Sequence, residues 1–251
     1  MTQTFAALLL AHVLADFVLQ TAAMAEGKAR RAALPLLLHV AVVAATATLA
    51  IGPLTPAALW PLLALAGAHL LIDLAKTLAP ADRLGPFLWD QAAHLGTLAA
   101  LAWLYPALFS DGAWGNMGDM GAMSARLPAL MALLAGLIAA TRAGGFAVGL
   151  LMTPWRDTDL PAGLTNGGML IGVLERGLIF LFILTGQPAA IGFLIAAKSV
   201  LRFDAAKTQQ AAGEYVIIGT LASFGWALLA SYATLWLLSA LPPLGIPDLS
   251  P

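Results

Sequence analysis

Four apolar segments between His12 and His94 carry the main structural signal of this sequence. They read HVLADFVLQ (12–20), LPLLLHVAVV (34–43), HLLIDLAKT (69–77) and DQAAH (90–94), and together they contain all four histidines of the chain. Three of the segments hold a histidine and an aspartate four residues apart. This spacing places both side chains on one face of a helix, one turn apart. Ionisable groups in apolar surroundings are costly, so we expect a functional site or a polar network here.

The composition indicates an integral membrane protein. Of the 251 residues, 61% are hydrophobic and 10% are charged, whereas about 25% of the residues of an average soluble domain are charged. The mean hydropathy is +0.88, and several apolar runs are long enough to cross a bilayer. No strand pattern is present. We therefore expect an all-α, polytopic bundle of transmembrane helices.

Charge and cysteine content exclude several classes of function. The net charge is −1, and no part of the sequence forms a basic domain that could neutralise phosphates. Nucleic acid is therefore not expected as a partner. Cysteine is absent, so any metal would be held by nitrogen and oxygen ligands. No phosphate-binding loop or dinucleotide motif occurs, and neither a nucleotide nor a haem is expected as a cofactor.

We predict eight membrane-spanning helices, at residues 4–20, 34–51, 57–78, 87–109, 125–152, 164–184, 188–203 and 214–240. Lysine and arginine gather on alternate connections between these helices, which is typical of cytoplasmic loops. The chain is therefore expected to be multi-pass, with both termini outside. In this topology all the histidines, together with Asp16, Asp73 and Asp90, lie at a similar depth on the cytoplasmic side.

The sequence predicts three parts: an N-terminal four-helix unit (1–109), a Gly/Met-rich external loop (110–124) and a C-terminal four-helix unit (125–251). The pattern H-x-L-x-D begins at His12 and again at His69, and each copy is followed by one further histidine. This weak internal repeat predicts two similar helical hairpins around an axis along the membrane normal. The expected product is a four-helix unit with a polar centre.

Neutral imidazoles and carboxylates are suitable ligands for Zn²⁺, Mn²⁺ or Fe²⁺. The predicted metal ligands are His12, Asp16, His39, His69, Asp73, Asp90 and His94. The three aspartates are also the candidate catalytic residues. Seven candidate ligands are more than the four that one tetrahedral site needs. The site could therefore hold two metals, or one metal whose ligands are supported by further carboxylates.

A metal at this depth could activate water against an ester or phosphoester in the inner headgroup layer. Lys28 and Lys76 are predicted to hold a substrate phosphate, and Gln20 and Gln91 to extend the same polar face. The hypothesis is a metal-dependent hydrolase of a lipid or phosphorylated substrate, with membrane lipids as partners. The alternative is a non-enzymatic carrier or partner-binding scaffold in which the cluster is a structural polar core.

The C-terminal half contains a second polar cluster, which comprises Glu175, Arg176, Lys198, Arg202 and Glu214. Consecutive residues do not face each other on a helix, so Glu175 and Arg176 are each expected to find a partner elsewhere. Lys198 and Arg202 are expected to reach the inner interface and its lipid phosphates.

Six short motifs resemble the bacterial membrane proteins catalogued as domain of unknown function 3307. They stand at His12–Gln20, His69–Asp73, Asp90–His94, Gly168–Arg176, Ala196–Phe203 and Glu214–Ser223. The resemblance extends over both halves of the chain. It implies a location in the bacterial inner (cytoplasmic) membrane, and it implies no activity.

Overall fold

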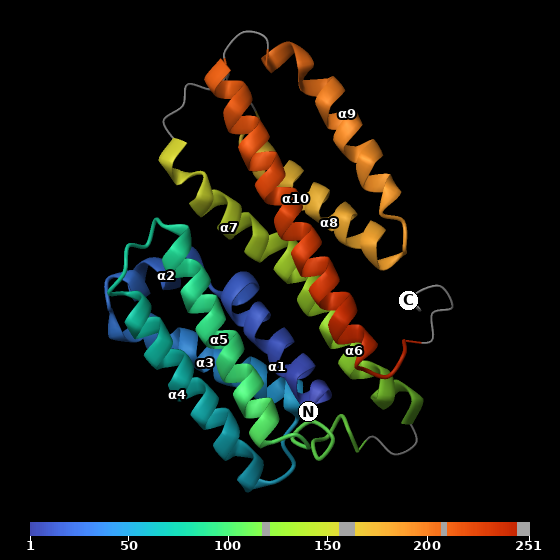
Figure 1. The fold of residues 1–251 in the computed structure, drawn as a ribbon. Coiled ribbons are helices and arrows are strands. Elements are labelled where there is room, and N and C mark those ends of the chain that lie inside the picture. Colours follow the sequence, from blue (N-terminus) through green and yellow to red (C-terminus); the bar gives the residue numbers. More distant parts are fainter. Residues whose placement is uncertain (117–120, 156–163, 207–209, 245–251) are drawn as a thin grey trace.

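The structure is a computed structural model that describes residues 1–116, 121–155, 164–206 and 210–244, without the side chains of 121–122 and 200–206. Within these ranges every regular element is a helix, as predicted (Figure 1). The N-terminal elements are α1 (Thr2–Leu14), the π-helical turn η1 (Ala15–Leu19), α2 (Ala22–Ala29), α3 (Ala33–Ile51), η2 (Pro56–Ala58), α4 (Leu59–Lys76) and α5 (Leu84–Leu104). They are followed by α6 (Gly121–Ile138), the π-helical turn η4 (Ala139–Ala143), α7 (Gly144–Leu151), η5 (Thr153–Trp155), α8 (Gly167–Leu184), α9 (Ala189–Ala206) and α10 (Gln210–Ser239).

Six helical stretches of the described chain are long and apolar enough to cross a membrane, which makes this a multi-pass membrane protein. They are Thr2–Leu19, Ala33–Ile51, Pro56–Lys76, Met123–Leu151, Gly167–Leu184 and Gln210–Ser239. The prediction of eight spans is close, because α5 and α9 also form at the two remaining positions. Polar residues at 90, 91 and 94 lower the hydropathy of α5, and the apolar part of α9 ends at Ser199.

Helices α1, α3, α4 and α5 form a closed ring in which each helix packs on the next and α5 returns to α1 (Figure 1). The basic connection after α1, which we expected to be a loop, folds into α2 and packs on α3. Thr21 caps this helix by accepting a hydrogen bond from the Met24 N–H at 3.2 Å, which satisfies a donor at the helix start.

Helix α1 belongs to the ring and also packs along α6. Ala6 is fully buried against Ala129 and Ala132 of α6, and small residues of this kind allow membrane helices to approach closely. Thr2 Oγ1 donates a hydrogen bond to the carbonyl of Ala240, at 3.2 Å. The start of α1 and the end of α10 therefore lie at the same end of the bundle. The predicted division into units 1–109 and 125–251, with an external loop at 110–124, and the placement of both termini outside stay predictions.

Gly136 allows α6 to approach α10 closely, and this contact can be tested. A Cβ at this position would overlap Thr234 Oγ1 and lie 2.8 Å from Thr234 Cγ2. Because overpacking a close-packed contact costs about 1–3 kcal/mol, we expect Gly136→Ala to lower the free energy of unfolding by that amount. Denaturant titration in detergent micelles measures it.

Gly225→Ala on α10 is the matched control, since a Cβ there would meet nothing within 4 Å. Alanine is favoured over glycine in helices by up to about 1 kcal/mol, so this change should be neutral or stabilising. The same free energy of unfolding for both variants would show that α6 and α10 do not meet at Gly136.

Candidate metal centre

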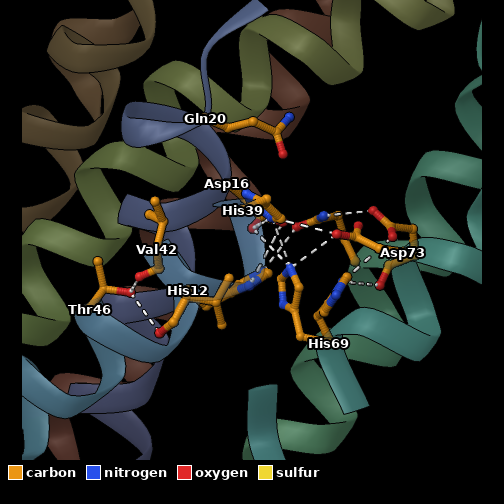
Figure 2. Close-up of polar contacts among 12 residues, drawn as sticks. His12, Asp16, Gln20, His39, Val42, Thr46, His69 and Asp73 are labelled. Atoms are coloured by element: carbon orange, nitrogen blue, oxygen red, sulfur yellow. Dashed lines mark hydrogen bonds and ion pairs between the residues drawn. The ribbon is translucent and has the colours of Figure 1, made fainter. Parts of the chain in front are cut away.

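The seven predicted ligands meet inside the ring of α1, α3, α4 and α5. Each ring helix contributes at least one histidine, as Figure 2 shows for His12, His39 and His69. The four histidines, Asp73 and Asp90 are all buried, with relative exposures of 5% or less, and the Asp16 side chain is 9% exposed. The structure therefore gathers in one place groups that are up to 82 positions apart in the chain.

A π-helical turn positions Asp16. The turn η1 extends α1 from Ala15 to Leu19, and the chain leaves it through Gln20 in an extended conformation. Wide turns of this kind are rare and occur frequently at functional sites. Here the turn directs Asp16 into the ring and brings Gln20 back toward α2.

Four donor atoms form a compact set that we call the quartet: Asp16 Oδ1, His39 Nε2, His69 Nε2 and Asp73 Oδ2. The two imidazole nitrogens lie 3.0 Å apart. Asp16 Oδ1 lies 3.3 Å from the first nitrogen and 3.5 Å from the second. Asp73 Oδ2 lies 3.6 Å from both. Metal bonds of about 2.0–2.1 Å in a tetrahedron require ligand atoms about 3.4 Å apart, so these distances match five of the six edges of such a tetrahedron.

His12 and His94 extend the quartet on one side. Their rings stack with centroids 5.1 Å apart, and the His94 ring lies 4.1 Å from that of His69. His12, Asp16 and His94 offer three donor atoms within 4.8 Å of one another, as do His69, Asp73 and His94. Asp16 Oδ2 lies 3.9 Å from His12 Nδ1. Asp16 thus presents one oxygen to the quartet and the other to His12, which is the geometry of a carboxylate that can bridge two ions.

The orientation of His94 is that of a metal ligand. Its Nδ1 lies 2.9 Å from the Asp90 carbonyl oxygen, and because a carbonyl only accepts, Nδ1 carries the hydrogen. Nε2 is then an unprotonated acceptor, and it is buried without a hydrogen-bond partner among the residues that the structure describes. Metal-bound histidines typically donate their other N–H to such an oxygen, which fixes the ring and the tautomer.

Lysine ammonium groups form ion pairs with two of the three carboxylates, those of Asp73 and Asp90. Lys28 Nζ lies 2.7 Å from Asp73 Oδ2 and donates to Gln20 Oε1 at 2.9 Å. Lys76 Nζ donates to Asp90 Oδ2 at 2.6 Å. The predicted phosphate-binding lysines therefore neutralise carboxylates of the centre in this structure. Their predicted role toward a substrate stays a prediction.

Gln91 connects α5 with α1 across the centre. Its amide nitrogen donates to Asp90 Oδ2 at 3.0 Å, and its oxygen lies 3.3 Å from His12 Nε2. All four residues predicted to bind substrate, Gln20, Lys28, Lys76 and Gln91, thus lie at the edge of the His/Asp centre.

The charges of the centre do not balance. Three carboxylates face two lysine ammonium groups, and among the described residues Asp16 has only histidines as partners. One negative charge is left over while the histidines are neutral, and a buried charge without compensation is strongly unfavourable. Among the described residues, Asp16 Oδ1 is also buried without a hydrogen bond, although such groups normally have a partner. A bound cation would compensate the remaining negative charge and would also give Asp16 Oδ1 a partner.

The space at the centre is small. A cavity of about 10 Å³ lies beside the rings of His12, His69 and His94, which is close to the minimum for one water molecule. Without rearrangement, this cavity can therefore hold one water molecule at most.

The predicted second polar cluster does not form one group. Lys198 Nζ donates to Glu175 Oε2 at 2.7 Å. Glu214 is exposed and accepts a hydrogen bond from Gln210 at 3.0 Å. The Arg202 side chain lies outside the described residues. Lys198 of α9 thus gives Glu175 a partner on another helix.

The partners of Arg176 were not predicted. Its Nε and Nη2 donate to the Thr141 carbonyl at 3.2 and 2.9 Å, and its Nη1 donates to Ser223 Oγ at 3.0 Å. Thr141 lies in η4, whose Ala139 carbonyl also accepts a hydrogen bond from the Trp226 indole at 2.9 Å. The second π-helical turn thus offers backbone oxygens to α8 and α10. Every residue has a carbonyl, so only the tertiary structure could identify this one.

Comparison with known proteins supports the resemblance seen in the sequence. Residues 4–112 match the family model described as "Protein of unknown function (DUF3307)". This range contains α1 to α5 and all seven His/Asp groups, whereas the three C-terminal motifs lie beyond it. No curated protein and no solved structure matches the chain. Over its N-terminal helices, this chain is thus similar to the DUF3307 family.

Proposed function

We propose that the His/Asp centre binds a divalent metal ion, either Zn²⁺, Mn²⁺ or Fe²⁺, through Asp16, His39, His69 and Asp73. The observation that carries the proposal is the spacing of the quartet, whose five donor distances of 3.0–3.6 Å match five of the six edges of one tetrahedron.

The chemistry of the quartet favours an ion over a simple hydrogen-bond network. Two imidazole nitrogens and two carboxylate oxygens face one another, and each can donate electron density. The uncompensated negative charge at Asp16 adds to the attraction for a cation. His12 and His94 supply two further nitrogens, and no described residue forms a hydrogen bond with the acceptor at His94 Nε2. A second ion that shares Asp16 is therefore part of the proposal.

The reaction that we propose for this centre is hydrolysis of a lipid ester or a phosphorylated substrate at the inner face of a bacterial membrane. A bound divalent ion would activate water and polarise the scissile group. Asp90 lies outside the quartet, and in the described part of the chain its buried Oδ1 has no hydrogen-bond partner, so it is the carboxylate best placed to accept a proton. Lys76, whose side chain is 37% exposed, marks the side from which a substrate would approach.

A non-enzymatic role is the second candidate, in which the protein is a carrier or scaffold and the centre a structural polar core. The small cavity and the pairing of both lysines with carboxylates favour it. This candidate needs a proton on a histidine, rather than a metal ion, to balance the charge of Asp16.

Elemental analysis tests the metal proposal. Protein purified in detergent without chelator is expected to contain one or two equivalents of Zn, Mn or Fe. The double variant His39→Ala plus His94→Ala, which removes a ligand from each side of Asp16, is expected to lose most of this metal. Asp82→Asn, which changes an exposed aspartate before α5, is the control and should retain it. Wild-type protein that contains no metal and binds none on titration with Zn²⁺ would refute the proposal.

Hydrolysis is tested separately on the metal-loaded protein, with p-nitrophenyl phosphate and with phospholipid in mixed micelles. We expect Asp90→Asn to retain the metal and to lose at least about 100-fold in rate, the usual contribution of a general base. Wild-type protein that holds metal but turns over neither substrate would leave metal binding in place and favour the carrier or scaffold.

A further inference from the structure

A second site lies in the C-terminal half, outside the range of the family match. A cavity of about 590 Å³ opens between α7, α8 and α10, which is within the usual size of small-molecule pockets. Its wall is mainly apolar and includes five glycines at positions 145, 149, 168, 172 and 219. Glu175, Arg176 and Lys198 lie at its inner side, and Arg142 is also part of the lining.

Arg176 has hydrogen-bonding capacity left for a ligand. The side chain is 3% exposed, and its three described hydrogen bonds go to the Thr141 carbonyl and to Ser223. A guanidinium has five N–H groups, so one N–H on each terminal nitrogen remains available. N–H groups on the two terminal nitrogens can both donate to a carboxylate or a phosphate.

Glycines give access to this guanidinium. A Cβ at Gly172 would lie 3.0 Å from Arg176 Nη1, and a Cβ at Gly145 would lie 3.2 Å from Nη2. Larger residues at these two positions would press on the atoms that still have N–H groups to offer. Their absence keeps the planar group reachable from the cavity.

The charges around the cavity favour an anion. Glu175 forms an ion pair with Lys198 at 2.7 Å. Within the described residues, no carboxylate lies within 4.0 Å of Arg176 or Arg142. The lining therefore has an excess of positive charge. Burying a guanidinium without a counter-charge in a membrane protein is costly, and an anionic ligand would offset this cost.

The rest of the cavity is suited to a hydrocarbon chain. Phe146, Met169 and Ile171 line it and are 55%, 62% and 44% exposed, on helical stretches that are apolar enough to lie in a membrane. The mouth of the cavity is therefore apolar where it faces the lipid, and the buried charges of Glu175 and Arg176 lie inside. We propose that this cavity binds an anionic amphiphile, with its phosphate or carboxylate group against Arg176 and its acyl chain along the glycine-lined wall.

The site does not depend on the proposed metal centre. The residues that line the cavity and those that form the His/Asp centre are different sets. Loss of metal from the His/Asp centre is therefore expected to leave binding of the amphiphile unchanged, and the two proposals can fail separately.

Native mass spectrometry of the full-length protein in detergent tests the proposal, with phosphatidylglycerol and phosphatidylcholine of the same acyl chains as probes. We expect phosphatidylglycerol to bind at least about 10-fold more tightly. Arg142→Glu, which reverses a charge of the lining, should lower that affinity at least about 10-fold. Arg126→Glu makes the same change at an exposed arginine outside the lining and should have no effect. Equal binding of the two lipids would overturn the proposal.

A second variant tests the place of the acyl chain. Gly149→Leu adds a side chain where a Cβ would meet nothing within 4 Å, in the wall of the cavity, and should lower phosphatidylglycerol binding at least about 10-fold. Gly96→Leu on α5 is the matched control in open space. Unchanged binding in Gly149→Leu would place the lipid elsewhere. Inorganic phosphate should not displace the lipid at millimolar concentration, and displacement would show a site for the anion alone.

Discussion

Asparagine at position 16 is expected to lower the affinity for Zn²⁺ by more than about 100-fold, because removal of a supporting residue alone costs 10- to 100-fold. Asp16 Oδ1 belongs to the quartet and Oδ2 faces His12, so the substitution reaches both proposed ions. Asparagine has nearly the shape of aspartate but carries no charge. Competition with a chelator of known affinity measures the change.

Asp90→Asn is the control for Asp16→Asn. Asp90 is buried in the same centre but is paired with Lys76 and lies outside the quartet, so we expect its substitution to change the affinity by less than about 10-fold. Equal losses in the two variants would show that the quartet is not the binding site.

The same Asp16→Asn variant separates the metal centre from a structural polar core. If Asp16 is a metal ligand, the substitution removes an uncompensated buried charge from the metal-free protein. The free energy of unfolding of the metal-free variant should then not fall below that of the metal-free wild type. If Asp16 instead forms a structural pair with a protonated histidine, breaking that pair should cost about 3–5 kcal/mol. Denaturant titration of metal-free protein in micelles distinguishes these results.

Lys28→Met is expected to lower the free energy of unfolding of the metal-free protein by about 3–5 kcal/mol, the usual cost of leaving a buried charge without its partner. Asp73 is 2% exposed and lies 2.7 Å from Lys28 Nζ. The double variant Lys28→Met plus Asp73→Asn removes both charges and should recover most of the loss. A double-mutant cycle from denaturant titrations in micelles measures the coupling.

Arg30→Met provides the comparison for Lys28→Met. Arg30 pairs with Glu26 at 3.8 Å on the same helix, but the two side chains are 79% and 70% exposed, so the loss should be about 0.5 kcal/mol or less. Similar losses in Lys28→Met and Arg30→Met would mean that Asp73 does not depend on Lys28 for its charge compensation.

The helical fold and the membership of the site follow from local features of the sequence. Long apolar runs require helices in a bilayer, because every backbone group must then be hydrogen-bonded within its own segment. The i, i+4 spacing of His12 with Asp16, and of His69 with Asp73, places each pair on one helical face. The basic loops, expected on the cytoplasmic side, set the direction of each helix and so predict that these faces lie at a similar depth in the membrane. The convergence of the seven groups could therefore be predicted from residues alone.

The contacts within the site could not be predicted in this way. The shortest quartet distances join different helices, such as His39 to His69 at 3.0 Å and His39 to Asp16 at 3.3 Å, whereas His12 and Asp16 on consecutive turns are 3.9 Å apart. The pairing of Lys28 with Asp73 depends on α2, which was expected to be a loop. Which donors share an ion depends on how helices cross, and spacing along one helix does not determine that.

In the C-terminal half, too, the sequence indicates which residues need partners, and only the tertiary structure shows which partners they have. Glu175 and Arg176 stand side by side in the sequence, and helical geometry alone indicates that they point to different partners. That Arg176 meets the Thr141 carbonyl depends on the π-helical turn η4 and on the glycines that bring α7 and α8 together. The sequence by itself determined helices, membrane insertion and the residue types available for chemistry. Only the tertiary structure decided which charges are compensated, because compensation depends on distances of a few ångströms between segments far apart in the chain.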